Sequence, residues 1–274
     1  MERAIVNSGV ELEYERVGEG EPVIFIHGAL IADAFQPLLR QPSLTTGSRM
    51  LNYHRRGHAG SSPGTGPVNV EQHARDCLSL MDALGIDRAH VDGHSYGGDI
   101  ALQMALDAPQ MVHSLALLEP ALFVGSSAAG YRAALEGART RYREAGGEVT
   151  LNEFLAARWP TYRAPLDAAI PGGFDQGARD AGVFFERELP GLLAWTFGEV
   201  EAQRINAPVL SILGGNDDIP GSRFAETHHF ILSTMPRPER AVVSDGWHLF
   251  HVQDPAATAA VLADFWAGHP IPDQ

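Results

Sequence analysis

One serine, Ser95, stands between Gly93 and Gly97 in the segment GHSYGG. A free serine hydroxyl is a weak nucleophile, and it becomes reactive only with a neighbouring base, an orienting acid and donors for the developing oxyanion. The spacing Gly-x-Ser-x-Gly suits that chemistry, because a tight strand-to-helix turn projects the hydroxyl and the glycines avoid collisions beside it. The alternative is a serine that only caps a helix. The elements around Ser95 must distinguish the two.

Partners for such a serine are expected in the order Ser, acid, His. The segment LGGNDD places Asp217 and Asp218 at the end of a predicted strand, and Glu119 at the end of an earlier strand is a further candidate for the acid. His248 follows the next strand on a loop, and His251 lies closer to the final helix. Each residue alone fits a turn aspartate or a loop histidine, but together and in this order they indicate nucleophilic catalysis.

Apolar strands alternate with helices on both sides of the serine. Strands are predicted at 3–6, 10–17, 23–28, 49–54, 89–93, 115–120, 208–215 and 241–244, and helices at 70–84, 97–107, 222–234 and 255–266. This alternation is typical of an α/β protein with a mostly parallel sheet and helices on both faces. Ser95 follows a strand and opens a helix, which favours the nucleophile.

The alternation stops between residues 122 and 205, where one short helix is predicted at 151–158. We expect 122–205 to be a helical cap inserted after the sixth strand, on a core domain made of 1–121 and 206–274, because ligands bind at one end of such sheets. Most aromatic residues of the cap should pack a small core of their own. Trp159 and Phe185 are expected to line an apolar substrate pocket.

The chain resembles the α/β-hydrolase superfamily, in its cap-bearing branch of esterases, haloperoxidases and epoxide hydrolases. The resemblance covers nearly all of the chain outside the cap. It rests on HGAL at 27–30, RRGHAGSS at 55–62, GHSYGG at 93–98, LGGNDD at 213–218 and GWHLFHVQDP at 246–255. It implies the α/β-hydrolase fold.

The resemblance also implies roles for individual residues. Ser95 would be the nucleophile, Asp217 the orienting acid and His248 the general base. The backbone N–H groups of Ala29 and Tyr96 would form the oxyanion hole. Because a histidine base shuttles the proton, neither an organic cofactor nor a metal is expected.

The expected reaction is hydrolysis of an ester, lactone or thioester of a small, largely apolar substrate through an acyl-enzyme, as in a carboxylic ester hydrolase. A cofactor-free haloperoxidase or a carbon–carbon bond hydrolase would use the same three residues. A non-catalytic ligand-binding protein would have the same fold but would not use these residues for catalysis. Epoxide hydrolases and haloalkane dehalogenases of this branch use an aspartate nucleophile, so the serine at position 95 argues against both.

The composition limits the kinds of partner that the protein is expected to bind. The 274 residues carry a formal net charge of −14, which disfavours nucleic acid and anionic membrane surfaces. The charged N-terminal segment does not resemble a signal peptide, and no run of 18 apolar residues occurs. The lone cysteine, Cys77, excludes an internal disulfide. We therefore expect a cytoplasmic monomer or homodimer that acts on a small molecule.

Overall fold

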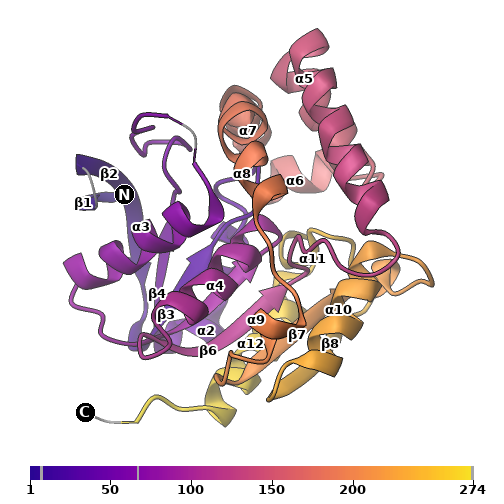
Figure 1. The fold of residues 1–274 in the computed structure, drawn as a ribbon. Helices are drawn as coiled ribbons and strands as arrows, with labels where there is room; N and C mark the ends of the chain where they lie inside the picture. The colour runs from indigo at the N-terminus through magenta and orange to yellow at the C-terminus, as the bar shows by residue number, and fades with distance from the viewer. Residues whose placement is uncertain (7–8, 67, 273–274) are drawn as a thin grey trace.

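One sheet organises the molecule. The computed structural model describes residues 1–6, 9–66 and 68–272. Within these ranges eight strands are ordered β1-β2-β4-β3-β5-β6-β7-β8 (Figure 1). β1 pairs antiparallel with β2 and β2 with β4, whereas the pairs from β4 through β8 are parallel. The expected mostly parallel sheet is confirmed. The strands are β1 (Glu2–Val6), β2 (Val10–Val17), β3 (Glu19–Ile26), β4 (Thr46–Tyr53), β5 (Ala89–His94), β6 (Val112–Leu118), β7 (Val209–Gly214) and β8 (Pro238–Val243).

Helices cover both faces of this sheet, and β3 shows how its residues divide between them. Successive side chains of a strand point to opposite faces. Ile24 and Ile26 pack in the core that contains α3 and α4, while Val23 and Phe25 pack in the core that contains α1, α2 and α12. The helices around the sheet are α1 (Gln36–Leu39), α2 (Pro42–Thr45), α3 (Val70–Ala83), α4 (Tyr96–Asp107), α10 (Arg223–Thr234), α11 (Phe250–Gln253) and α12 (Pro255–Gly268).

A helical insertion separates β6 from β7, as expected after the sixth strand. Its helices α5 to α8 lie above the sheet in Figure 1, and α5 packs against α7. α5 is far longer than the predicted helix at 151–158, although its helical geometry is interrupted at Gly146, where φ is 80°. The elements are α5 (Ala128–Ala156), α6 (Arg163–Ala169), α7 (Gly173–Gly182), the π-helical turn η2 (Val183–Glu188), α8 (Leu189–Ala194) and α9 (Glu199–Ala202).

The topology brings the candidate residues to one edge of the sheet. The carboxyl ends of parallel strands meet at the same edge, where α/β proteins bind their ligands. Ala29 follows β3, Ser95 follows β5, Glu119 follows β6, and His248 follows β8. Asp217 ends the short helix η3 (Gly215–Asp217) after β7. The sheet therefore supports one chemical site under the insertion.

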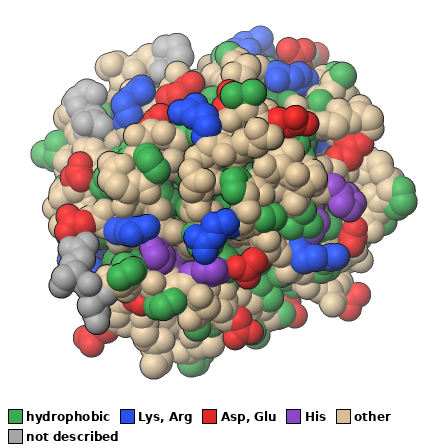
Figure 2. All heavy atoms as spheres, turned by 60° about the horizontal axis from the view of Figure 1, so that its bottom comes forward, with side chains coloured by type: hydrophobic (Ala, Val, Ile, Leu, Met, Phe, Trp, Pro, Cys, Tyr) green, Lys and Arg blue, Asp and Glu red, His purple; other side chains and the backbone are tan. Residues whose placement is uncertain are grey.

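The surface and the helices give two further observations. On the face shown in Figure 2, basic and acidic side chains are interspersed without a continuous basic area. In the described ranges, none of the helices has the length and apolar character needed to span a bilayer.

Candidate active site

Ser95 stands on a strained turn between β5 and α4. Its backbone angles are φ 51° and ψ −120°, a conformation that L-residues rarely adopt. A Cβ on Gly93 would lie 2.3 Å from the carbonyl oxygen of Gly97, and a Cβ on Gly97 would lie 2.0 Å from that of Ile26. Both positions therefore require glycine. This packing holds the serine hydroxyl at the start of α4, as the Gly-x-Ser-x-Gly spacing predicts.

His248 is oriented by a carboxylate, and that carboxylate is Glu119. Nδ1 of His248 lies 2.6 Å from Oε2 of Glu119, and both side chains are buried. The backbone N–H of Gly214 donates to Oε1 of Glu119 at 2.7 Å. The backbone carbonyl of His248 accepts a hydrogen bond from Nε2–H of His94 at 2.9 Å. The contact at Nδ1 leaves Nε2 of His248 as the nitrogen that can accept a proton.

The expected contact of Asp217 with Nδ1 of His248 is not made: Glu119 occupies that position, while Asp217 accepts a hydrogen bond from the backbone N–H of His248. Oδ2 of Asp217 is buried and has no hydrogen-bond partner among the described residues, while Asp218 is exposed. β6 and β7 are parallel neighbours, so a carboxylate at the end of either strand can approach the histidine. Glu119 has the longer side chain, and its backbone turns with φ 48° directly after β6. It occupies the position at Nδ1 that the sequence assigned to Asp217.

Burial dominates the ionisation of these groups. It lowers the pKa of His248 well below the usual value, and the positive charges of Arg223 and Arg158 act in the same direction. Burial raises the pKa of Glu119, and the charge of Asp217 adds to that shift. Burial also raises the pKa of Asp217, to about 6. The neutral imidazole that a general base requires is thus the favoured form of His248.

Ser95 and His248 line the same cavity, which lies between the sheet and the insertion. Phe154 and Leu155 of α5 form part of its wall, and Ala29 lies beside the serine. The cavity is small, with a volume of about 30 Å³.

The expected pocket residues Trp159 and Phe185 do not line this cavity. Trp159 is 3% exposed and Phe185 is fully buried, and both belong to the continuous hydrophobic core. The ring of Phe185 stacks on Tyr142 at 5.3 Å and meets Phe184 at 5.1 Å. These contacts hold the insertion together. The expectation for both residues is therefore corrected in favour of Phe154 and Leu155.

Contacts to its carbonyl oxygen fix the orientation of the peptide unit between Gly28 and Ala29. Its carbonyl oxygen accepts from Nη2–H of Arg55 at 2.9 Å, and Nδ1 of His27 lies 2.8 Å from it. In a planar trans peptide, the N–H points away from the C=O of the same unit. Anchoring the Gly28 carbonyl therefore fixes the direction of the Ala29 N–H. Tyr96 opens α4, where backbone N–H groups lack partners within the helix.

Arg55 is held in turn by Glu188 of η2. Both side chains are fully buried and form an ion pair, and the same carboxylate oxygen lies 2.8 Å from Nε2 of His73 and 3.2 Å from Nε2 of His58. Burial acts to raise the pKa of Glu188, but Arg55 and the two histidines outweigh it and lower the pKa well below the usual value. The insertion thus reaches the Gly28–Ala29 peptide through one buried charge cluster. Sequence reasoning missed Glu188, because a π-helical turn leaves no helical periodicity.

Two arginines beside the site were also missed. Arg158 lines the cavity with Ser95 and His248, and its guanidinium stacks on the ring of Phe154 at 3.4 Å. Arg223 begins α10, directly after the segment that contains Asp217. The only signal in the sequence is their position beside motif residues, which does not reveal where the side chains point.

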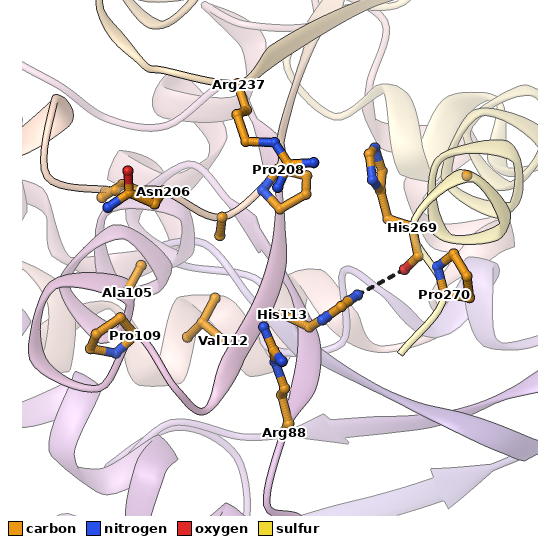
Figure 3. Close-up of a pocket in the computed structure, with 13 residues that line it drawn as sticks. Arg88, Ala105, Pro109, Val112, His113, Asn206, Pro208, Arg237, His269 and Pro270 are labelled. Carbon is orange, nitrogen blue, oxygen red and sulfur yellow. Dashed lines mark hydrogen bonds between the residues drawn. The ribbon is translucent and has the colours of Figure 1, made fainter. Parts of the chain in front are cut away.

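A larger cavity, of about 410 Å³, lies at the opposite end of the strands (Figure 3). Val112, the first residue of β6, and Pro208, just before β7, form part of its wall. Nε2–H of His113 donates to the backbone carbonyl of His269 at 3.0 Å across it. The described residues that line it include no serine, cysteine or carboxylate. It therefore lacks the groups that the expected chemistry needs.

Comparison with known proteins places these observations in a family. The family described as "alpha/beta hydrolase fold" matches residues 21–223. The chain is 30% identical, over 95% of its length, to the dihydrolipoyllysine-residue acetyltransferase component of the acetoin cleaving system of Cupriavidus necator, and it spans 62% of that protein.

Solved structures agree on the fold. A thermophilic esterase from Thermogutta terrifontis aligns with a TM-score of 0.84 and 19% identity, covering 98% of this chain and 100% of that one. The enol-lactonase from Burkholderia xenovorans LB400 aligns with a TM-score of 0.77 and 23% identity, covering 97% of this chain and 100% of that one. At this level of identity the likeness establishes the arrangement of the elements.

Proposed function

The chain belongs to the alpha/beta hydrolase family, and we propose that it is a serine hydrolase that cleaves an ester, lactone or thioester through an acyl-enzyme on Ser95. One observation carries the proposal. A serine on a strained turn shares a cavity with a buried histidine whose Nδ1 lies 2.6 Å from a carboxylate. The names of the structural neighbours, an esterase and an enol-lactonase, support the same class of reaction.

In the proposed reaction, Nε2 of His248 takes the proton of Ser95 while Oγ attacks the carbonyl carbon. Glu119 holds the imidazole in the tautomer with a proton on Nδ1 and stabilises the imidazolium that forms. The N–H groups of Ala29 and Tyr96 stabilise the oxyanion of the tetrahedral intermediate. The imidazolium protonates the leaving alcohol or thiol. Water, deprotonated by His248, then attacks the acyl-enzyme, and collapse of the second intermediate releases the acid and restores the serine.

The substrate must enter beneath the insertion. The wall formed by Phe154 and Leu155 is apolar, which supports a small substrate with an apolar body. Because the cavity volume is only about 30 Å³, we infer that the wall formed by the end of α5 is displaced when a substrate binds. The interruption at Gly146 offers a point at which α5 can bend.

A fluorophosphonate probe tests the proposal directly, because it phosphonylates only an activated serine. We expect stoichiometric labelling at Ser95, detected by mass spectrometry of the intact protein and its peptides. Ser95→Ala and His248→Gln should abolish labelling. His251→Gln is a matched control, because this neighbouring buried histidine has no hydrogen-bond partner for either ring nitrogen among the described residues. An unlabelled folded protein would favour a ligand-binding function.

A further inference from the structure

Arg158 presents a positive charge to the reaction cavity, and Asp217 is the carboxylate whose charge acts on it. Its guanidinium lines the cavity that contains Ser95 and His248. Nη1–H donates to the backbone carbonyl of Phe154 at 2.8 Å, and the guanidinium stacks on the same ring. These contacts hold the side chain in place, but they involve no carboxylate. The other N–H groups of the guanidinium can donate to an acceptor in the cavity.

Arg223 does not line the cavity itself, but its charge acts on Arg158. Its guanidinium is sandwiched between the rings of Tyr131 at 3.8 Å and Phe224 at 3.7 Å. Nη1 and Nη2 are buried and have no hydrogen-bond partner among the described residues. A buried charged donor without an acceptor is costly, so these two donors indicate that something else supplies the acceptor.

The two arginines belong to one site. The ring of Phe224 also packs on the ring of His248 with centroids 4.4 Å apart, so Arg223 is separated from the base by one aromatic ring. The charge of Arg223 acts on Arg158, whose pKa burial and that charge lower to about 10. Asp217 is the nearby carboxylate, yet its Oδ2 makes no hydrogen bond among the described residues. One cation thus lines the cavity of the proposed nucleophile, and a second, whose Nη1 and Nη2 have no partner among the described residues, is close enough to act on its pKa.

We propose that Arg158 and Arg223 bind a carboxylate of the substrate, so that this hydrolase prefers esters or lactones that carry a second, free carboxylate group. The inference rests on the proposed function, which it makes more specific. Planar guanidinium forks match carboxylate geometry, and their aromatic stacking pre-orients them for it. The carboxylate lies under the insertion, and the carbonyl that is cleaved lies at Ser95.

A matched pair of substrates tests this preference. Mono(p-nitrophenyl) adipate and p-nitrophenyl hexanoate have acyl chains of the same length and differ by the terminal carboxylate. We expect wild-type kcat/KM to favour the adipate ester by about ten- to a hundredfold, the range of a charged hydrogen bond. Arg158→Gln and Arg223→Gln should each lower this ratio about tenfold or more, while Arg158→Lys should retain part of it.

A control separates this effect from the loss of an arginine–aromatic stack. Arg163 stacks on Phe174 at 3.8 Å within the insertion and lies outside the cavity. Arg163→Gln should leave the ratio unchanged. An unchanged ratio in folded Arg158→Gln and Arg223→Gln would overturn the proposal.

Binding to Ser95→Ala protein provides a readout that does not depend on turnover. Calorimetry should show that hexanoate binds at least tenfold more tightly than hexanamide, and that Arg158→Gln removes the difference. If neither ester is hydrolysed but hexanoate is selected, the carboxylate site stands and the hydrolase proposal fails. If both esters are hydrolysed equally and hexanoate binds no more tightly than hexanamide, the hydrolase proposal stands and the carboxylate site is wrong.

Discussion

Glu119, at the end of β6, lies 2.6 Å from Nδ1 of His248, in the position that the sequence assigns to Asp217 after β7. Both carboxylates satisfy the order Ser, acid, His along the chain, and both stand at the ends of adjacent parallel strands. Only the folded structure distinguishes them. It gives Glu119 hydrogen bonds on both oxygens and leaves Oδ2 of Asp217 without one among the described residues.

Substitution of the two carboxylates tests which of them orients the base. Glu119→Gln should lower kcat by about two to four orders of magnitude with little change in KM, because an amide can hold the imidazole in the unproductive tautomer. Asp217→Asn should lower kcat less than about tenfold. Steady-state kinetics with p-nitrophenyl hexanoate measure both, and circular dichroism checks that both variants fold. An inactive Asp217→Asn beside an active Glu119→Gln would restore the assignment made from the sequence.

The activity should also depend on pH through His248. Burial is the main reason why the pKa of His248 lies well below 6.5. The base must be neutral, so kcat/KM should rise with pH through an ionisation below that value and remain high above it. The charged or titratable groups that act on His248 are Glu119, His94, His251, Arg158 and Arg223, and Asp217 accepts from its backbone N–H.

Arg223→Gln tests the direction in which a nearby positive charge shifts the pKa of His248. Removal of a positive charge makes protonation of His248 easier, so the acidic limb of kcat/KM should move to higher pH by roughly half to one unit. Profiles should be recorded with p-nitrophenyl hexanoate, which carries no charge of its own. Arg163→Gln should leave the limb in place. A shift of the Arg223→Gln limb to lower pH would contradict this electrostatic account.

The sheet was predictable because its central strands, such as β5 and β7, are buried on both faces. β2 spans the predicted residues 10–17, and the other strands differ from their predicted bounds by a few residues. α5 joins two helices across a kink at Gly146, and the prediction at 151–158 covers most of the second. The first was missed, because glycines at positions 137 and 146 weaken its helical pattern. Local motifs single out Ser95 and His248 in the sequence, and Glu119 is a candidate for the acid from its place at the end of a strand. The contacts that Glu119, Arg223 and Glu188 make join distant segments, which leaves no local pattern.

Glu188 should contribute to both stability and catalysis. Glu188→Gln removes the charge that compensates the fully buried Arg55, and breaking such a pair costs roughly 3–5 kcal/mol of unfolding free energy. Loss of the Arg55 anchor should also loosen the Gly28–Ala29 peptide and lower kcat more than it changes KM.

A neighbouring glutamate offers the control for that substitution. Glu186 lies in the same π-helical turn but pairs with Arg143 at the surface, at 2.7 Å. Glu186→Gln should change the unfolding free energy by about 0–1 kcal/mol and leave kcat unchanged. Urea unfolding and steady-state kinetics measure both variants. Equal destabilisation by the two substitutions would show that the buried cluster has no special role.

Phe154 should determine which acyl chains the cavity accepts. Its side chain lines the cavity of about 30 Å³ beside Ser95, so Phe154→Ala should open space for longer chains. Across neutral p-nitrophenyl esters of increasing length, the chain with the highest kcat/KM should then be longer than in the wild type by about two to four carbons, the length of the removed ring.

Phe185→Ala should instead lower the unfolding free energy by about 3–5 kcal/mol, because Phe185 is fully buried among aromatic rings of the insertion. It should leave the ranking of chain lengths unchanged, since the side chain does not line the cavity. If Phe185→Ala changed the ranking and Phe154→Ala did not, the substrate would bind within the insertion rather than between the insertion and the sheet.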